Sequence, residues 1–343
     1  MFIMSENNLK PSQVSKTTPL DRLHKTLEKD MVETNNLIVQ RLQSQVPVIG
    51  KVAHYIIAAG GKRIRPLLTL ASARMFKTSD MSKAHLLAAS VEFIHTATLL
   101  HDDVVDDSEQ RRGQESSHII FGNEKAVLVG DYLFARAFEL MVETNKIEVL
   151  DSLSRASSII TEGEVRQLTT TRKLDTDIED YFKVIDGKTA ALFASACAVG
   201  AMIAEQDAQI QKNMHDYGQN LGMAFQITDD VLDYSASESR LGKKTGDDFR
   251  EGKMTLPVIL ALKQADKEEK LFWGRVIEDP ENMQAEDFSH AQNLLVSHGV
   301  FDQAYKIANE HARKARLSLA EIPTSPIKVT LEELLEYCVR RLY

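Results

Sequence analysis

Apolar residues recur at the three- and four-residue spacing of an α-helix through most of this sequence. Residues 86–101 (LLAASVEFIHTATLLH) are apolar on nearly every face, which predicts a helix deep in a core. The same spacing predicts further helices over 126–144, 148–170, 178–203, 208–234, 256–264, 284–298, 301–320 and 329–342. Glycines are expected mostly to separate helices, at positions 113, 122, 130, 163, 187, 222 and 242. Because no convincing pair of strands is evident, the pattern predicts an all-α protein.

Proline and polarity set the expected boundaries of the fold. No proline lies between Pro66 and Pro257, and because proline costs about 3 kcal/mol inside a helix, this stretch can hold long helices. Residues 1–18 are polar and are expected to be disordered. The length of 343 residues alone suggests two domains, but no Pro/Gly/Ser-rich linker or fixed-period repeat divides the rest. We therefore predict a single all-helical domain over 19–343.

Charge and cysteine content narrow the classes of partner. The net charge is −9, from 41 basic and 50 acidic residues, which argues against a nucleic-acid partner. Two cysteines, Cys197 and Cys338, are too few for a disulfide framework or a four-cysteine zinc site, and they fit a reducing compartment. No stretch approaches the roughly 20 apolar residues of a membrane span, and the N-terminus lacks the pattern of a secretory signal or transit peptide. The sequence therefore predicts a cytoplasmic protein without a transmembrane segment.

Two aspartate clusters are the clearest chemical feature. Both match the pattern D-D-x-x-D, and they comprise Asp102, Asp103 and Asp106, and Asp229, Asp230 and Asp233. On a helix, residues i and i+4 share a face, so each motif stacks carboxylates that repel one another. A hard divalent cation reverses this repulsion, and Mg²⁺ typically binds one or two carboxylates together with water and substrate phosphates. The alternative is a pair of solvated acidic helix ends, which the apolar neighbours TATLLH and MAFQIT disfavour.

Several basic residues accompany the clusters, and Arg111 and Arg112 follow the first one within six residues. The basic residues are Lys62 and Arg65 in the turn GGKRIRP, Arg111 and Arg112, Lys188 beside Thr189, and Lys243 and Lys253. Lysine and arginine donate to phosphate oxygens, so the mixture indicates one site for a metal–diphosphate. Taken singly, each is explained as well by a helix cap or a solvated loop. His95 and Gln226 lie on the helix faces of the two clusters, although a lone histidine in an apolar helix is more often a core residue.

These motifs, in this order, resemble those of the all-trans polyprenyl diphosphate synthases, especially the long-chain octaprenyl to decaprenyl branch. The resemblance runs from about Gly60 to Pro257 and rests on GGKRIRP, EFIHTATLLHDDVVDDSEQRRG, VLVGDYLFARAF, GEVRQL, GKTA, FQITDDVLDY and LGKKTGDDFREGKMTLP. Asp107 and Met254 stand where relatives often have other residues. The resemblance implies an isoprenoid-synthase-type helical bundle with a central cavity, assembled as a homodimer.

The resemblance also implies an activity: head-to-tail (1'-4) condensation of isopentenyl diphosphate onto an allylic diphosphate, with farnesyl or geranylgeranyl diphosphate as expected primers. The product would be an all-trans chain of about C40–C50, the precursor of a quinone side chain such as that of ubiquinone. Ionisation of the allylic diphosphate would create the cation that the isopentenyl double bond attacks, and the departed diphosphate would take the proton. A hydrophobic product implies release toward a membrane, through peripheral contact at most.

The resemblance assigns roles to individual residues. The six aspartates would hold Mg²⁺, three ions when substrate is bound. The catalytic residues would be Asp102, Asp103, Asp106, Lys188, Asp229 and Asp230. The allylic substrate would contact Arg111, Lys188, Thr189, Gln226 and Lys243. Isopentenyl diphosphate would contact Lys62, Arg65, His95 and Arg112, with Lys253 near both diphosphates.

Small residues precede the first aspartate cluster. Ala97 and Thr98 lie one turn before Asp102, where short-chain relatives carry bulky aromatics, so a longer product is expected. The floor of the cavity is predicted to lie deeper, at Phe134, Phe138 or Met141. The alternative is that the small residues only allow close helix packing.

Other functions share part of this pattern. A class I terpene cyclase has one D-D-x-x-D motif, but its second metal motif is normally of the N-S-E type and its cavity is aromatic, whereas this chain has one tryptophan. A regulatory subunit of a heteromeric prenyl synthase usually lacks one of the aspartate motifs, and both are present here. A carboxylate di-iron bundle would need Glu-x-x-His pairs, which the clusters do not supply.

Overall fold

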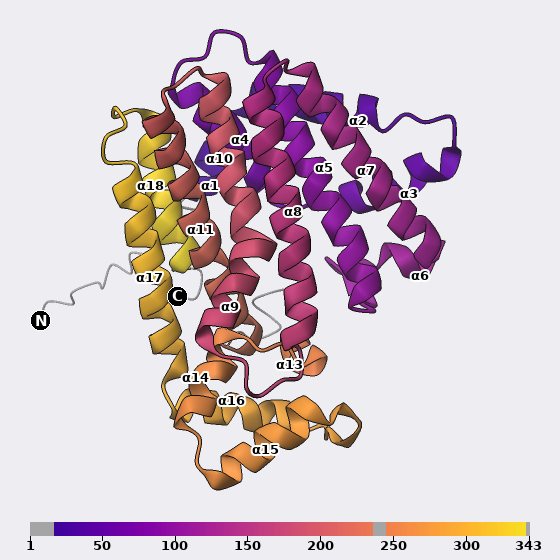
Figure 1. Ribbon diagram of the computed structural model, residues 1–343, viewed down its shortest axis with the longest axis vertical. Coiled ribbons are helices and arrows are strands. Elements are labelled where there is room, and N and C mark those ends of the chain that lie inside the picture. The colour runs from indigo at the N-terminus through magenta and orange to yellow at the C-terminus, as the bar shows by residue number, and fades with distance from the viewer. Residues whose placement is uncertain (1–16, 236–244, 341–343) are drawn as a thin grey trace, which may run out of the picture.

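Long helices run side by side along the molecule in a computed structural model that describes residues 17–235 and 245–340 (Figure 1). The first helices are α1 (Pro19–Thr26), α2 (Glu28–Arg41), α3 (Pro47–Ala58), α4 (Ile64–Met75) and α5 (Ser82–Val105). The middle of the chain forms α6 (Ser117–Phe121), α7 (Asn123–Glu143), α8 (Ile147–Thr170), α9 (Ile178–Ile185), α10 (Ala191–Ile203) and α11 (Ala208–Ser235). The last part forms α13 (Asp247–Glu251), α14 (Leu256–Gln264), α15 (Lys267–Glu278), α16 (Asp287–Ser297), α17 (Val300–Ser318) and α18 (Pro326–Val339).

Short elements complete the described chain. A π-helix, η1 (Asp186–Ala190), joins α9 to α10, and a 3₁₀ turn, η2 (Pro280–Asn282), follows α15. Strands β1 (Gln110–Arg111) and β2 (Gln114–Glu115) pair antiparallel as a two-residue hairpin. The all-α prediction is confirmed, although the hairpin was not anticipated because two-residue strands leave no alternating pattern to detect.

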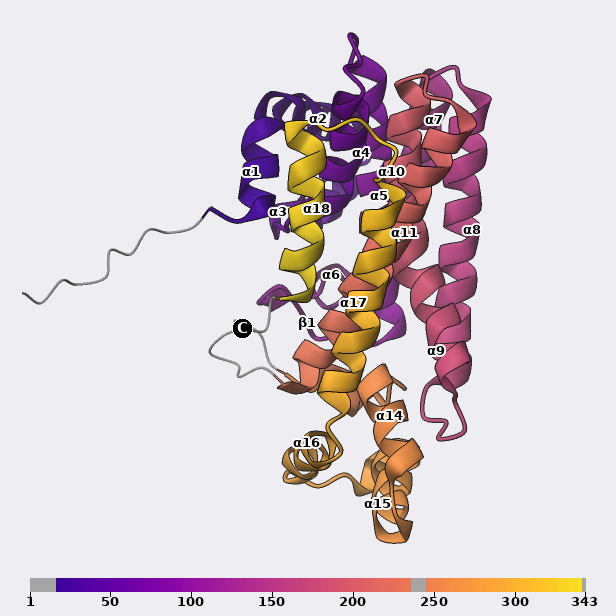
Figure 2. The same cartoon turned by 90° about the vertical axis from the view of Figure 1, so that its left-hand side faces the viewer.

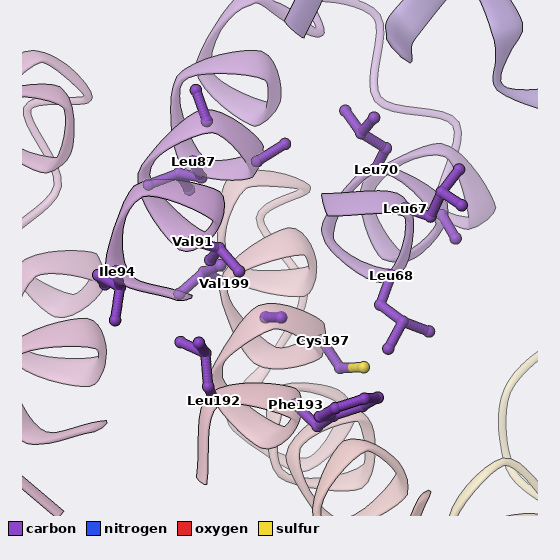
Figure 3. Close-up of a cluster of buried hydrophobic side chains, with 14 of the residues drawn as sticks. Leu67, Leu68, Leu70, Leu87, Val91, Ile94, Leu192, Phe193, Cys197 and Val199 are labelled. Carbon is purple, nitrogen blue, oxygen red and sulfur yellow. The ribbon is translucent and has the colours of Figure 1, made fainter. Parts of the chain in front are cut away.

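The main core lies where α4, α5 and α10 meet (Figure 3). Helix α5 packs against α2, α4, α7 and α10, which explains why its sequence is apolar on nearly every face. Leu87, Val91 and Phe93 are completely buried in this helix. Burial of each such side chain contributes roughly 1.5–3 kcal/mol to the free energy of unfolding. The core therefore fixes α5 firmly, and the first aspartate cluster lies at the end of that helix.

A second group of buried side chains lies around Trp273 and Phe249, toward the lower end of Figure 1. Helix α11 links the two groups, because Leu221 packs in the main core whereas Ile227 and Val231 pack in the second. Helix α17 runs along α11 over much of its length (Figure 2). The last turns of α11, which carry the second aspartate cluster, are thus held between packed neighbours.

Most predicted helices are confirmed to within a few residues, and α14 has the predicted limits of 256–264. The predicted helix 178–203 is wrong in its middle, because the π-helix η1 interrupts it at Asp186–Ala190. A π-helix holds more residues per turn than an α-helix, so the side chains that follow η1 point in a different direction from those of a continuous α-helix. The prediction of disorder over 1–18 is wrong at its end: Thr18 caps α1, accepting a 3.1 Å hydrogen bond from the Asp21 amide. Residues 1–16 lie outside the described part of the chain.

Several glycines that were predicted to separate helices lie inside them. They are Gly130 in α7, Gly163 in α8, Gly187 in η1 and Gly222 in α11. Each allows a close approach; a Cβ at Gly187 would lie 2.9 Å from Gly163 Cα. The predicted role fails because sequence alone does not show which neighbour approaches. Arg65 and Pro66 lie in the first turn of α4, where proline is tolerated because an amide there has no helical partner.

One described stretch, Ile178–Ile203, is long and apolar enough by composition to cross a membrane. Its most apolar window is 83% buried inside the protein, as expected for a core helix. Helices α4, α8 and α11 pack around α10, the most apolar part of this stretch.

Candidate active site

The first aspartate cluster occupies the C-terminal end of α5. Asp106 is the residue that ends the helix, and its amide donates a 2.8 Å hydrogen bond to the Asp102 carbonyl. Asp102 and Asp106 are half-buried, whereas Asp103 is only 1% exposed. Arg111 Nε donates to Asp103 Oδ1, and the other oxygen, Oδ2, is buried without a hydrogen-bond partner. Burial raises the pKa of Asp103, although Arg111 opposes this shift.

The second aspartate cluster lies on the last turns of α11. Both oxygens of Asp230 accept hydrogen bonds, at 2.7 Å from the Tyr181 hydroxyl and at 2.8 Å from the Gln226 amide. Burial raises the pKa of Asp230 to about 7, against the lowering effect of these two hydrogen bonds. Asp233 is also buried and accepts a 3.0 Å hydrogen bond from the Asp248 amide. Asp229 remains half-exposed, so it is the most accessible carboxylate of this cluster.

Two lysines from other parts of the chain contact the first cluster. Lys188 Nζ lies 3.6 Å from Asp102 Oδ2 and 2.6 Å from Glu164 Oε2. Burial acts to lower the pKa of Lys188, but the carboxylates of Asp102 and Glu164 outweigh it and the pKa is raised. Lys253 follows the second cluster in the chain, and its Nζ lies 2.9 Å from Asp106 Oδ2. The nearby carboxylates of Asp248, Asp106 and Glu251 raise the pKa of Lys253 against the effect of burial.

The donor set fits a hard divalent cation. The candidate ligands are all carboxylate oxygens, and one of them, Asp103 Oδ2, is buried and unsatisfied. Two lysine ammonium groups lie beside Asp102 and Asp106, where they offset part of the negative charge. Within 17–235 and 245–340, no three His, Cys, Asp or Glu side chains converge closely enough to form a metal site on their own. A cation such as Mg²⁺ would therefore complete its coordination with water and phosphate oxygens, as it usually does.

A separate basic group lies beside the first cluster. The β1–β2 hairpin turns at Arg112 and Gly113, both with positive φ, and this turn brings Arg112 against Gly61. A Cβ at Gly61 would lie 2.8 Å from the Arg112 guanidinium, which would have to shift, and the positive φ of Gly61 also favours glycine. Arg65 Nη1 lies 3.2 Å from His95 Nε2, and its guanidinium stacks 4.6 Å from the Phe193 ring centre.

Electrostatics shape this basic group. Burial and the neighbouring arginines lower the pKa of His95 well below its usual value, so its imidazole is neutral at pH 7. Burial lowers the pKa of Arg65 to about 10, which still leaves the guanidinium charged at neutral pH. The arrangement offers fixed positive charges and one neutral hydrogen-bonding ring, as a diphosphate site requires.

The remaining predicted residues divide into three cases. Thr189 donates a 2.7 Å hydrogen bond to Gln226 Oε1, so these two predicted allylic contacts bond to each other. Lys62 is exposed on the loop before α4, and its carbonyl lies 3.1 Å from His24 Nε2. Lys243 lies outside the described residues.

A groove of about 870 Å³ lies between α7 and α8. Phe134 and Phe138 line it from α7, facing a row of serines and threonines from Ser154 to Thr169 on α8. Ala97 is completely buried in the main core, and Thr98 is half-buried. Met141 is also completely buried in the main core and is not among the residues that line the groove, unlike the two phenylalanines.

Sequence analysis missed three residues that contact the site. They are Glu164, which pairs with Lys188; Tyr181, which holds Asp230; and Glu92, which pairs with Arg63. Glu164 lies within GEVRQL and Glu92 within EFIH, so both stood in motifs already noticed. A charged residue in an otherwise apolar helix indicates a paired or functional side chain, and Glu92 is such a residue. Tyr181 carried none, because its partner lies 49 residues away.

Comparison with known proteins agrees with this geometry. A family model described as Polyprenyl synthetase matches residues 46–295. Octaprenyl diphosphate synthases of Haemophilus influenzae and Escherichia coli are 40% and 39% identical over 324 residues, covering 94% of this chain and 98% and 99% of those proteins.

Two solved structures extend the likeness to the fold. A decaprenyl diphosphate synthase from Rhodobacter capsulatus has a TM-score of 0.91 and 47% identity, covering 95% of this chain and 100% of that one. A polyprenyl synthase from Caulobacter crescentus, complexed with calcium and isoprenyl diphosphate, has a TM-score of 0.90 and 48% identity, covering 94% of this chain and 98% of that one.

A helical bundle with an aspartate cluster on each of two helices, lysines beside the first cluster and a group of arginines next to it is typical of a prenyltransferase of the isoprenoid-synthase fold. The chain belongs to the polyprenyl synthetase family. It is a long-chain, all-trans polyprenyl diphosphate synthase, and the predicted fold and enzyme class are confirmed. The family uses a divalent metal, isopentenyl diphosphate and an allylic diphosphate.

Proposed function

We propose that this enzyme adds isopentenyl units 1'-4 to farnesyl or geranylgeranyl diphosphate until the chain reaches about C40–C50. We assign the product to the supply of quinone side chains. The observation that carries the proposal is the contact of Lys188 with Asp102 and of Lys253 with Asp106. Oxygen ligands for metal and cations for phosphate thereby surround one space. The octaprenyl and decaprenyl products named for relatives support the product length.

The six aspartates are our proposed ligands for three Mg²⁺. Bound Mg²⁺ would supply positive charge that makes the diphosphate a better leaving group. Lys188, Lys253 and Arg111 now pair with carboxylates, and they are positioned to exchange these for phosphate oxygens. Their fixed charges stabilise the diphosphate as its bond to the allylic carbon breaks. Thr189 and Gln226 would likewise exchange their mutual hydrogen bond for the substrate.

The isopentenyl diphosphate would occupy the basic group formed by Lys62, Arg65, His95 and Arg112. Arg65 is held in place by His95 and by the Phe193 ring, so its guanidinium needs little reordering on binding. The isopentenyl double bond then attacks the allylic carbon and forms the new carbon–carbon bond. The proton lost from the adduct passes to the departed diphosphate, so no side-chain nucleophile is required.

Product length is assigned to the groove between α7 and α8. Ala97 and Thr98 on α5 are small, and Phe134 and Phe138 are the bulky aromatic residues that line the groove. We propose that these two phenylalanines limit the length of the product chain. Met141 is buried in the main core and does not line this groove.

We propose a homodimer whose interface includes α7 and α8. Exposed apolar side chains gather there, including Leu128 at 66%, Val142 at 59% and Val165 at 56%. Leu128, Ala135 and Val142 repeat at seven-residue spacing, which places them on one face of α7. Sedimentation of Leu128→Glu tests this: the variant should be monomeric, whereas Leu271→Glu, equally exposed on α15, should stay dimeric. A dimeric Leu128→Glu protein would move the interface elsewhere.

We infer that residues 19–343 fold as one unit in the cytoplasm. The shared use of α11 by both buried groups supports one unit, and two buried free cysteines, Cys197 and Cys338, fit a reducing compartment. Release of the product would need only peripheral contact with a membrane.

A product assay tests the proposed function. Purified protein, Mg²⁺, farnesyl diphosphate and labelled isopentenyl diphosphate are incubated, and the dephosphorylated products are sized by chromatography. A ladder ending near C40–C50 that EDTA abolishes is the expected result. Cyclised hydrocarbon would instead identify a terpene cyclase, and no incorporation with any allylic primer would contradict a self-sufficient synthase and indicate a required partner subunit.

A further inference from the structure

Glu92 is a buried carboxylate inside an otherwise basic pocket. It lies on α5, three residues before His95, and is only 7% exposed. Arg63 Nη1 donates a hydrogen bond to Glu92 Oε1, and the two side chains form a half-buried ion pair. A negative charge here is unexpected, because the same pocket is the proposed site for a diphosphate.

Arg63 contacts this carboxylate, and two further guanidinium groups act on it electrostatically. Burial raises the pKa of Glu92, and the nearby charges of Arg63, Arg65 and Arg112 each lower it. The same charges affect the pKa of Arg65. Burial lowers this pKa, the carboxylate of Glu92 raises it and the guanidinium of Arg112 lowers it. Glu92 therefore offsets the mutual repulsion of the arginines while no substrate is bound.

The Arg63–Glu92 ion pair lies at an unusual backbone conformation. Arg63 has φ +48°, a left-handed conformation that side chains other than glycine rarely adopt, and it directly precedes α4. The contact with Glu92 ties Arg63, and with it the end of the loop 60–63, to α5. That loop presents Arg65 at the start of α4 and, at Gly61, touches the guanidinium of Arg112.

We propose that Glu92 is a positioning residue of the isopentenyl diphosphate pocket, which keeps Arg63 away from the substrate and holds Arg65 and Arg112 side by side for its diphosphate. The inference rests on the proposed assignment of this pocket to isopentenyl diphosphate. Glu92 acts through the arginines and does not itself touch the substrate, since two like charges would repel.

Steady-state kinetics with one substrate varied at a time test the inference. Glu92→Gln should raise the KM for isopentenyl diphosphate about tenfold and change the KM for farnesyl diphosphate less than twofold. Arg63→Met should show the same split because it removes the same ion pair. The double variant Glu92→Gln/Arg63→Met should be no worse than the more impaired single variant, since both changes break one contact.

A matched control separates positioning from stability. Asp30 is another buried carboxylate paired with an arginine, Arg74, which is exposed; the pair joins α2 to α4 away from the pocket. Asp30→Asn should lower the unfolding midpoint and leave both KM values unchanged. A purely structural Glu92 would behave in the same way as Asp30.

Two results would overturn the inference. One is a KM for isopentenyl diphosphate that stays unchanged or falls in Glu92→Gln, and the other is an equal rise in both KM values. If Glu92→Gln does not fold, Arg63→Met decides alone by the same criterion. Wild-type protein that incorporates no isopentenyl diphosphate would overturn the proposed function together with this inference. Normal wild-type turnover with no split in the variants would overturn the inference alone.

Discussion

Lys253 Nζ lies 2.9 Å from Asp106 Oδ2, joining residues that are 147 positions apart in the chain. This contact ties the loop after the second aspartate cluster to the first cluster. The lysine compensates negative charge that a metal and a diphosphate would otherwise meet. Part of the negative charge of the site is thus compensated before substrate arrives, and we expect binding to exchange these ion pairs for contacts with phosphate.

Replacement of Lys253 by methionine should lower kcat on the order of 10²-fold, because one fixed charge on the leaving diphosphate is lost. Methionine keeps most of the length of the side chain, so the fold should persist. Steady-state kinetics at saturating substrates measure the effect. Lys270→Met, an exposed change on α15, serves as the control and should be silent. Activity within twofold of wild type for Lys253→Met would remove this lysine from the mechanism.

Gly187→Ala should impair activity by separating η1 from α8. The new Cβ would lie 2.9 Å from both Gly163 Cα and the Ile159 carbonyl oxygen, and neither backbone can yield easily. We expect a loss of about 1–3 kcal/mol in the free energy of unfolding, with a displaced Lys188 and a lower kcat. Urea denaturation and kinetics check both effects.

Gly274 on α15 provides the matched control for Gly187. A Cβ there meets only Leu174 Cδ1 at 3.8 Å, an ordinary contact. Gly274→Ala should stabilise the helix by up to about 1 kcal/mol and leave kcat unchanged. If the two alanine variants behave alike, close packing between η1 and α8 does not position Lys188.

Asp30 should make stability depend on pH. Burial alone would raise its pKa, but hydrogen bonds from Arg74 at 2.8 Å and His85 at 3.0 Å outweigh it, and the pKa falls below the usual 3.8. A carboxyl group whose pKa is lowered by folding stabilises the protein above its unfolded pKa and loses that effect as pH falls through the folded value. At pH 7, Asp30→Asn should therefore cost about 1–3 kcal/mol.

Urea denaturation at pH 7 and near pH 3 tests the assignment for Asp30. The difference between wild type and Asp30→Asn should shrink as the pH falls below about 3.8. A difference that stays constant over this range would show that the carboxylate charge is not the source of the stability.

Phe138→Ala should lengthen the product, because Phe138 is 37% exposed and lines the groove between α7 and α8. Chromatography of the dephosphorylated products measures the chain. Met141→Ala is the control: it should lower the free energy of unfolding by about 2–5 kcal/mol and leave the product unchanged, since Met141 is completely buried in the core. An unaltered ladder from Phe138→Ala would exclude this residue as the floor.

The sequence predicted the helical fold and the proximity of opposite charges because both depend on local spacing. Apolar residues at helical spacing marked α5 and α11, and the i, i+4 aspartates followed from the same geometry. Lys188 and Lys253 were predicted from the family motifs GKTA and LGKKTGDDFREGKMTLP that contain them. Their partners, Asp102 and Asp106, emerge from tertiary packing.

Features that depend on distant neighbours could not be predicted. The hydrogen bond from Tyr181 to Asp230 joins α9 to α11, and no local pattern marks it. Gly163 and Gly187 were predicted to separate helices. Instead they lie against each other where α8 and η1 approach closely. The π-helix η1 (Asp186–Ala190) packs against α8 and α11, and no local sequence pattern shows which helices will approach it.

The central claim is that both aspartate clusters act on one metal–diphosphate. Incorporation of labelled isopentenyl diphosphate by Asp102→Asn and by Asp229→Asn tests it most directly, with the exposed Asp151→Asn on α8 as control. The account predicts a loss of at least about 100-fold in each cluster variant, and wild-type activity in the control. Full activity in either cluster variant would contradict the claim that the two clusters form one active site.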